Sequence, residues 1–178
     1  MSIQWNRRFA RVVVALLVGV LAGCAAPIIV TSPDTFNVPA GAAKHLRAGG
    51  NVALNNAYQA ETKVKIWTYS DTGWFGDLKQ YTDTAITMLG REMQKKSVAV
   101  DPKAAKTVTL RVYDLSASAP WHLRFVLILE AQYGDGTKST IKSENRSPWT
   151  VWSAVDGSLM VAVFRLLGDD KFLAYVNN

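Results

Sequence analysis

The sequence is poor in the residues that most often carry chemistry. It contains one cysteine, Cys24, and two histidines, His45 and His122. A single cysteine forms no disulfide within its own chain, and neither histidine has a second histidine or a cysteine at the spacing of a zinc site. The sequence also lacks a glycine-rich phosphate loop and a nucleophile elbow. These absences predict a protein with no metal, no cofactor and no enzymatic activity.

One combination of residues around His122 has an alternative interpretation. Asp114 and Ser116 precede this histidine by a few positions, so the three side chains could be imagined as a catalytic triad. Polar residues of these types are also typical of a turn between two strands. We favour the turn.

The N-terminal segment is shorter than a transmembrane span. Its apolar run, from 12 to 26, follows three arginines and falls short of the about 20 residues that cross a bilayer. A basic start followed by a short apolar run is typical of a secretory signal. A plain secretory signal cut at an A-x-A site, a membrane anchor and a buried helix are the alternatives for this segment.

The end of this segment, Leu-Ala-Gly-Cys at 21–24, resembles the lipobox of bacterial lipoprotein signals. The resemblance implies a signal peptide over 1–23 that is removed, and a lipid-modified Cys24 at the start of the mature chain. Each buried methylene of an acyl chain contributes about 0.8 kcal/mol, so that several chains anchor a protein firmly. In enterobacterium-like sorting, Ala25 in place of an aspartate implies the outer membrane. The resemblance therefore implies an outer-membrane lipoprotein, lipid-anchored and facing the periplasm.

The positive charge of the chain is partly due to the signal. Three of the twenty lysines and arginines, at positions 7, 8 and 11, lie in residues 1–23, so the formal charge falls from +6 to about +3 without them. Nucleic-acid binding needs clustered basic residues, and the remaining charge is not clustered. The sequence therefore predicts no nucleic-acid partner.

The composition divides the rest of the chain into a tether and a domain. Residues 24–50 are rich in Ala, Pro, Ser, Thr and Gly and hold few large apolar side chains. Such a stretch predicts a lipidated, flexible tether, followed by a single domain over 51–178. A strand at Ile28–Thr31 is the alternative for part of this segment.

Hydrophobic periodicity predicts the elements of the domain. Strands are expected over 51–58, 63–69, 107–115, 123–133 and 137–145. The first two are expected to pair as a hairpin. The nearly continuous apolar run at 123–133 predicts a central strand covered on both faces, and a glycine-containing turn at 133–137 leads to a polar edge strand. This order predicts an α+β fold, with a mostly antiparallel sheet and two helices packed on one face.

Two aspartates are expected to cap the helices. Asp77 would begin the first helix, and Asp156 would begin a second that ends at Leu167. The expected inward-facing residues, which recur at helical spacing, are Leu78, Tyr81, Ala85, Leu89 and Met93 in the first helix and Leu159, Met160, Val163, Phe164 and Leu167 in the second.

The region from 77 to 175 carries a second resemblance. A helix precedes a strand of the type Lys106–Leu115, a central hairpin follows, and the closing sequence at 166–173 is Leu-Leu-Gly-Asp-Asp-Lys-Phe-Leu. This pattern resembles small envelope lipoproteins of the YajG type and, more distantly, lipopolysaccharide-assembly or transport-auxiliary lipoproteins. It implies their fold. Function must be argued from a site.

Aromatic residues are the candidates for such a site. Trp74 and Phe75 precede the first expected helix, and Trp149 and Trp152 precede the second, in what we expect to be loops. Tryptophans at loop tips often anchor a partner, although they can also staple a loop onto the core. We therefore expect a non-catalytic envelope protein that binds another envelope component, first of all a protein. The alternative is a module that binds glycan or lipopolysaccharide through these tryptophans.

Overall fold

A computed structural model describes residues 28–32, 34, 37–69, 71–118, 123–147 and 151–178. Within these ranges, the strands are β1 (Ile28–Ile29), β2 (Asn51–Asn56), β3 (Lys63–Tyr69), β4 (Thr72–Asp77), β5 (Ala99–Val100), β6 (Lys106–Ser118), β7 (Leu123–Tyr133) and β8 (Lys138–Ser147). The helices are α2 (Leu78–Gln94), α3 (Val151–Leu167) and α4 (Asp170–Asn177).

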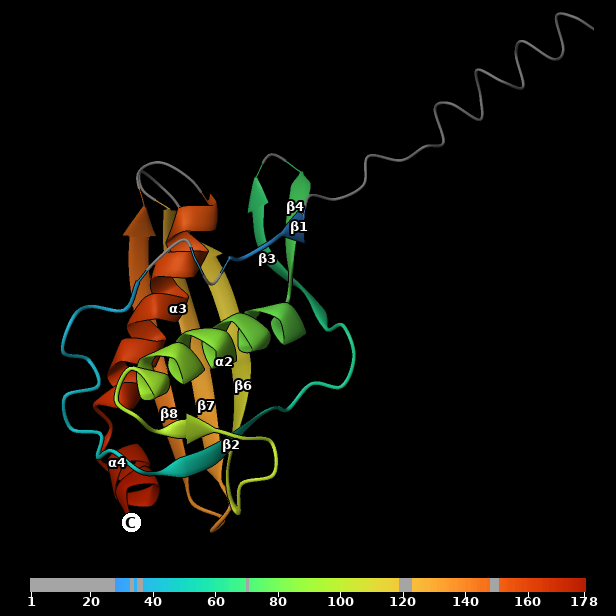
Figure 1. Ribbon diagram of the computed structural model, residues 1–178. Coiled ribbons are helices and arrows are strands. Elements are labelled where there is room, and N and C mark those ends of the chain that lie inside the picture. The colour runs from blue at the N-terminus through green and yellow to red at the C-terminus, as the bar shows by residue number, and fades with distance from the viewer. Residues whose placement is uncertain (1–27, 33, 35–36, 70, 119–122, 148–150) are drawn as a thin grey trace, which may run out of the picture.

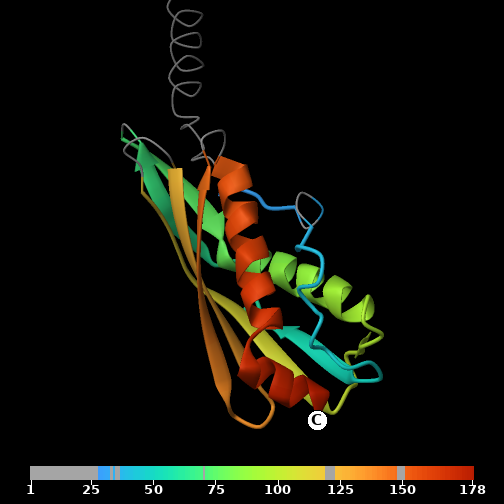
Figure 2. The same cartoon turned by 90° about the vertical axis from the view of Figure 1, so that its left-hand side faces the viewer.

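The strands form two sheets. The larger has the order β5-β2-β6-β7-β8, and the smaller has the order β1-β4-β3. The long pairings of β6 with β7, β7 with β8 and β3 with β4 are antiparallel, whereas β2 runs parallel to both of its neighbours. Figures 1 and 2 show α2 and α3 together on one side of the larger sheet. The predicted α+β fold, with a mostly antiparallel sheet and two helices on one face, is confirmed.

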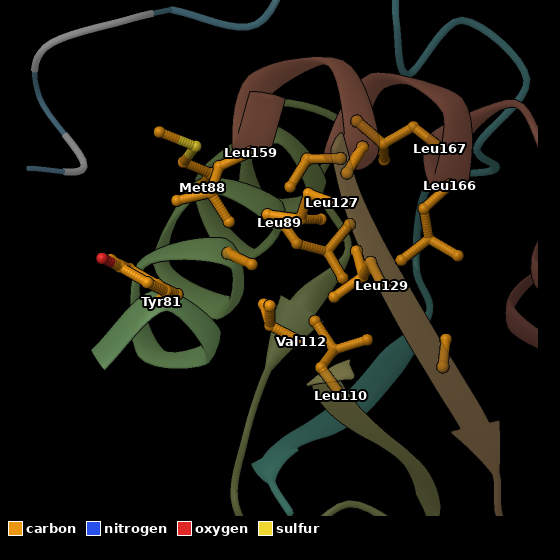
Figure 3. Close-up of a cluster of buried hydrophobic side chains, with 14 of the residues drawn as sticks. Tyr81, Met88, Leu89, Leu110, Val112, Leu127, Leu129, Leu159, Leu166 and Leu167 are labelled. Atoms are coloured by element: carbon orange, nitrogen blue, oxygen red, sulfur yellow. The ribbon is translucent and has the colours of Figure 1, made fainter. Parts of the chain in front are cut away.

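The hydrophobic core fills the space between this sheet and the two helices (Figure 3). Its fully buried members include Leu110 and Val112 of β6, Leu127 and Leu129 of β7, Leu89 of α2, and Leu159, Leu166 and Leu167 of α3. All five residues expected on the inward face of α2 are buried. Asp77 caps this helix as predicted, since its Oδ1 accepts a hydrogen bond from the backbone N of Lys79 at 3.0 Å.

The burial of β7 differs from the expectation of cover on both faces. The strand has the predicted bounds, but every second residue from Phe125 to Tyr133 is buried and the residues between them are not. Only the face toward the helices is therefore covered, with the alternation of period two that a strand imposes. Val126 and Ile128 lie on the open face, and these two apolar residues hid the alternation in the sequence.

Helix α3 begins earlier than predicted. It starts at Val151, so that Asp156 lies inside the helix, 3% exposed, and is not its cap. Leu159, Val163 and Leu167 face inward as expected. Phe164 does not, since it is 42% exposed, and Met160 is only partly buried, because both lie one position beyond the buried stripe of the helix. The segment after Gly168 is the short helix α4.

The predicted hairpin between the first two strands is wrong. β2 lies between β5 and β6 in the larger sheet, and β3 pairs with β4 in the smaller one. β4 covers the segment before α2 that the sequence predicts to be a loop. Gly76 allows a close approach, since a Cβ there would overlap the hydroxyl of Tyr81 on α2.

The predicted tether over residues 24–50 is corrected for the part that the structure describes. We call residues 28–50 the N-terminal strap. Ile29 is 0% exposed in β1, and further along the strap Val38, Ala43 and Leu46 are buried against the core. A few apolar residues are enough here, because they pack against the core of the domain and need no core of their own. Figure 2 shows it running along the outer side of α2 and α3.

Candidate functional site

Two tryptophans of one hairpin and a third from a helix about eighty residues later in the sequence meet at one end of the domain. They are Trp67 of β3, Trp74 of β4 and Trp152 of α3, and we call them the aromatic cluster. The ring centroids of Trp67 and Trp74 are 6.2 Å apart, and those of Trp74 and Trp152 are 6.0 Å apart at an interplanar angle of 83°. Edge-to-face packing of this kind is a favoured geometry for aromatic pairs. The structure thus joins two of the predicted site residues, Trp74 and Trp152.

A β-bulge in β3 adds the third ring. Lys65 pairs with Phe75 and Trp67 pairs with Trp74, so that two residues of β3 are opposed by one residue of β4. Trp67 is then directly across from Trp74, although simple alternation placed it on the face opposite the buried Ile66. The periodicity of the sequence gave no sign of this bulge, and for that reason it did not place Trp67 in the site.

The predicted site residues lie in regular elements and not in loops. Trp74 and Phe75 are paired residues of β4, and Trp152 lies in the first turn of α3. Trp149 falls outside the residues that the structure describes, and so does Cys24. Trp74 and Phe75 are partly buried, whereas Trp152 is 45% exposed. In the aromatic cluster, Trp74 is therefore held in the strand and partly covered, whereas the ring of Trp152 is open to solvent.

Arg124 and Arg146 pair with each other on β7 and β8, where β7 begins and β8 ends. Asn145 of β8 donates hydrogen bonds to the carbonyls of Ser153 and Ala154, which fixes the end of β8 against the helix. On the opposite, open face of the sheet, Glu144 accepts hydrogen bonds from Arg124 at 2.6 Å and from Arg146 at 3.3 Å. The hydrogen bond from Arg124 is the main reason that the pKa of Glu144 is lowered to about 2. Two guanidinium groups share one carboxylate here, so that the group keeps a net positive charge.

A second exposed aromatic residue, Tyr113, lies on the open face of the larger sheet. β6 has a register shift between Val112 and Asp114, which leaves Tyr113 58% exposed. The guanidinium carbon of Arg111 lies 4.9 Å from the centroid of this ring, and its Nη2 is 3.0 Å from Glu130 on β7. We call these three residues the Tyr113 patch. The sequence gives no signal for this patch, because the bulge that turns Tyr113 outward has no signature in it.

The structure brings no catalytic arrangement together among the residues it describes. In these ranges there is no group of three or more His, Cys, Asp and Glu side chains that could hold a metal ion. Asp114 and Ser116 are exposed on the open sheet face, and His122 lies outside the residues that the structure describes. His45 lines an open hollow with Lys44, Phe164 and Arg165, where the lining residues include no acid and no cysteine.

No helix in the described part of the chain is by itself long and apolar enough to cross a membrane. α3 and α4 together pass the same test of length and composition, with a bend of 60° between them.

Comparison with known proteins gives similarity at the level of solved structures. No family model matches the chain, and no curated protein matches it either. Among solved structures, it is similar to the crystal structure of protein XCC0632 from Xanthomonas campestris, which carries the family description DUF330. The TM-score is 0.47 at 12% sequence identity, and the match covers 85% of this chain and 92% of that one. A similarity at this level does not extend to function.

Proposed function

We propose that the protein is a non-catalytic lipoprotein of the cell envelope. In this proposal, acyl chains on Cys24 anchor it in the outer membrane, its domain faces the periplasm, and it acts by binding another envelope protein. The anchor is supported by the basic residues, the short apolar run and the sequence Leu-Ala-Gly-Cys at 21–24.

The binding role is supported by one observation above all, the Tyr113 patch on an open sheet face. Figure 2 shows the helices on the other side of the sheet only. Tyrosine and arginine are enriched among residues that contribute most to protein interfaces. Glu130 and the ring of Tyr113 hold the guanidinium of Arg111 in place. The partly buried Val126 and Ile128 lie on the same face of the neighbouring strand. The patch is thus a preorganised aromatic and basic group with apolar surface beside it.

Metabolic labelling tests the anchor. Cells that express the full chain are given a palmitate analogue, and wild type is compared with Cys24→Ser. We expect wild type to incorporate the label and the variant to lose it. Equal labelling of the two would contradict a lipid on Cys24.

Crosslinking in membranes tests the protein partner. A photo-reactive amino acid is placed at Tyr113 and, as a matched control, at Phe164, which is also exposed but lies on α3. We expect a discrete protein adduct from position 113 and none from position 164. A Arg111→Gln change in the same chain should weaken the adduct. The same adducts from both positions, or none from 113, would contradict the proposal.

A second candidate function uses the aromatic cluster, with Phe75 and Trp149 added from the sequence analysis. The observation that favours this second function is the exposed ring of Trp152, which packs edge-to-face with Trp74. An open indole can stack on a sugar, so the ligand would be a glycan or lipopolysaccharide. Titration with peptidoglycan fragments and with lipopolysaccharide should then change tryptophan fluorescence, and Trp152→Phe should remove most of that change. A signal that is the same in the variant would exclude this site.

A further inference from the structure

The way in which the chain enters the fold fixes where a lipid on Cys24 can lie. β1 runs parallel to β4, with Ile28 opposite Phe75 and Ile29 opposite Gly76. The hydroxyl of Tyr81 donates a hydrogen bond to the carbonyl of Ile29 at 2.8 Å, and Ile29 is 0% exposed. The strap is therefore fixed to the domain from its first described residues.

Only four residues of chain lead from Cys24 to Ile28. Fully extended, they span at most about 14 Å, because a residue covers no more than about 3.6 Å. Ile28 lies beside Phe75, the neighbour of Trp74 in β4. An acyl anchor on Cys24 would thus hold the bilayer within a short distance of the aromatic cluster. The C-terminus lies at the far end of the domain (Figure 1).

The chemistry of this end suits a membrane surface. Tryptophan is enriched at the level of the lipid headgroups, where its ring meets apolar chains and its N–H meets water. Trp152 offers such a ring at 45% exposure. Lys65 on β3, Arg124 and Arg146 are exposed and outnumber the two carboxylates of this end, Glu144 and Asp71 in the turn between β3 and β4, so that these five side chains carry a net positive charge. Basic side chains near a membrane surface are attracted to anionic lipids.

We propose that the aromatic end of the domain, formed by Trp152 and Trp74 together with Arg124 and Arg146 on the open face of the same end of the larger sheet, docks on the headgroup region of an anionic phospholipid bilayer. This inference rests on the proposed lipid anchor. Docking holds the larger sheet upright on the membrane, with the Tyr113 patch turned to the side, where a protein in the same compartment reaches it.

Quenching by brominated lipid tests the docking. The full chain is expressed, processed by the cell, purified with its lipid and reconstituted into vesicles that contain phosphatidylglycerol and a lipid brominated in its acyl chains. Mass spectrometry of the same sample reports acylation. We expect bromine to reduce tryptophan fluorescence in wild type, and Trp152→Phe to lose most of the quenchable part.

A second indole position on the same helix provides the matched control. Phe164 is exposed like Trp152 and lies 12 residues further along α3, about 18 Å along the helix axis. The double variant Trp152→Phe, Phe164→Trp moves the indole by that distance. We expect the indole at 164 to escape quenching, because docking through the aromatic end keeps it away from the bilayer.

A longer linker separates docking from simple tethering. Twenty Gly and Ser residues are inserted between Ala26 and Pro27, which lets the domain leave the surface. We expect Trp152 to remain quenched on anionic vesicles, and to lose quenching on neutral ones or when Arg124 and Arg146 are both changed to Gln.

The outcomes are distinguishable. Acylated protein with an unquenched Trp152, equal quenching at 152 and 164, or loss of quenching on anionic vesicles once the linker is long would overturn the docking and leave the anchor intact. A photo-crosslink from position 152 to a protein, without quenching, would assign this end to a protein partner and would also overturn it. Protein without acyl chains would overturn the anchor and, with it, this inference.

Discussion

Aromatic side chains gather at both ends of the domain. The aromatic cluster lies at one end, and Tyr133, Phe172 and Tyr175, which we call the C-terminal cluster, lie at the other. The two clusters differ in how far they are buried. At the aromatic end, Trp67, Trp74 and Trp152 have contacts with one another, and Trp152 is 45% exposed. At the C-terminal end, Tyr133 stacks on Tyr175 with 5.1 Å between ring centroids, and lies 6.4 Å from Phe172. Tyr133 and Phe172 are almost completely buried, at 2% and 0% exposure.

The hydroxyl groups of the C-terminal cluster form hydrogen bonds within the protein. Tyr133 donates a hydrogen bond to Ser139, and Ser139 donates to Asp169, the cap of α4. Burial is the main cause that raises the pKa of Tyr133 to about 12. The hydroxyl of Tyr175 accepts hydrogen bonds from the backbone N–H groups of Thr107 and Gly134. A closed and satisfied cluster of this kind stabilises a fold, whereas an open one presents surface to a ligand.

The largest expected effect is at the closed cluster. Phe172→Ala removes a fully buried ring from the contact between α4 and the sheet. Such a change costs about 3–5 kcal/mol of unfolding free energy, from lost burial and the cavity left behind. Urea unfolding followed by circular dichroism measures it. Phe164→Ala, at a residue that is 42% exposed, is the control and should change the unfolding free energy by less than about 1 kcal/mol. Equal losses in both variants would contradict the assignment of a structural role to the C-terminal cluster.

A smaller loss is expected from Tyr175→Phe. The ring and its stacking on Tyr133 remain, but the backbone N–H of Thr107 loses the hydroxyl that accepts its hydrogen bond. The N–H of Gly134 loses the same acceptor and keeps a second one, the carbonyl of Thr107 at 3.0 Å. We expect a loss of about 1 kcal/mol, since both donors lie where water can partly replace the hydroxyl. The matched control, Tyr113→Phe, removes a hydroxyl from an exposed ring and should leave the midpoint of urea unfolding unchanged. If the two variants have the same midpoint, the hydroxyl of Tyr175 contributes nothing to the closed cluster.

Trp152→Ala is expected to have little effect on stability. The ring is nearly half exposed, so its removal should lower the unfolding free energy by less than about 1 kcal/mol. The same change should remove most of the lipid-dependent quenching. A loss as large as that of Phe172→Ala would mean that Trp152 is a core residue, and the difference between the two ends would then disappear.

The sequence was a good guide where one local rule decides the structure. The cap at Asp77, the inward face of α2 and the bounds of β7 all follow from periodicity and capping within a single element. The sequence predicted badly where distant segments decide. The burial of the strap depends on core residues that lie far along the chain, and the pairing of β2 depends on β6, which lies about fifty residues later. Neither partner can be found from a local pattern.

The candidate site follows the same division. Trp74 and Trp152 stand before two expected helices in the sequence, which is why both are candidate site residues. The sequence predicts loops at both positions. That they touch depends on the contact between β4 and the start of α3, which no spacing encodes. Trp67 and Tyr113 were missed because each lies at a β-bulge. A bulge breaks the period of two on which strand predictions depend.

The smallest expected effect concerns Glu144 and the two arginines that share its carboxylate. The hydrogen bond from Arg124 holds the pKa of Glu144 at about 2, below its ordinary value of 4.5, so this ion pair stabilises the fold above the ordinary pKa. As the pH falls below 4.5, the unfolded chain takes up the proton first, and the stabilising effect is lost through pH 2. Arg124→Gln should therefore raise the pKa of Glu144 toward its ordinary value, which a carboxyl NMR titration measures. The variant should also have a shallower dependence of stability on pH between 4.5 and 2 than wild type.

Lys142→Gln is the control and should leave this titration unchanged. Lys142 is exposed on the same strand and has no side-chain contact with Glu144 among the ion pairs described. If Glu144 titrates at its ordinary pKa in wild type, its carboxylate is not shared by the two arginines.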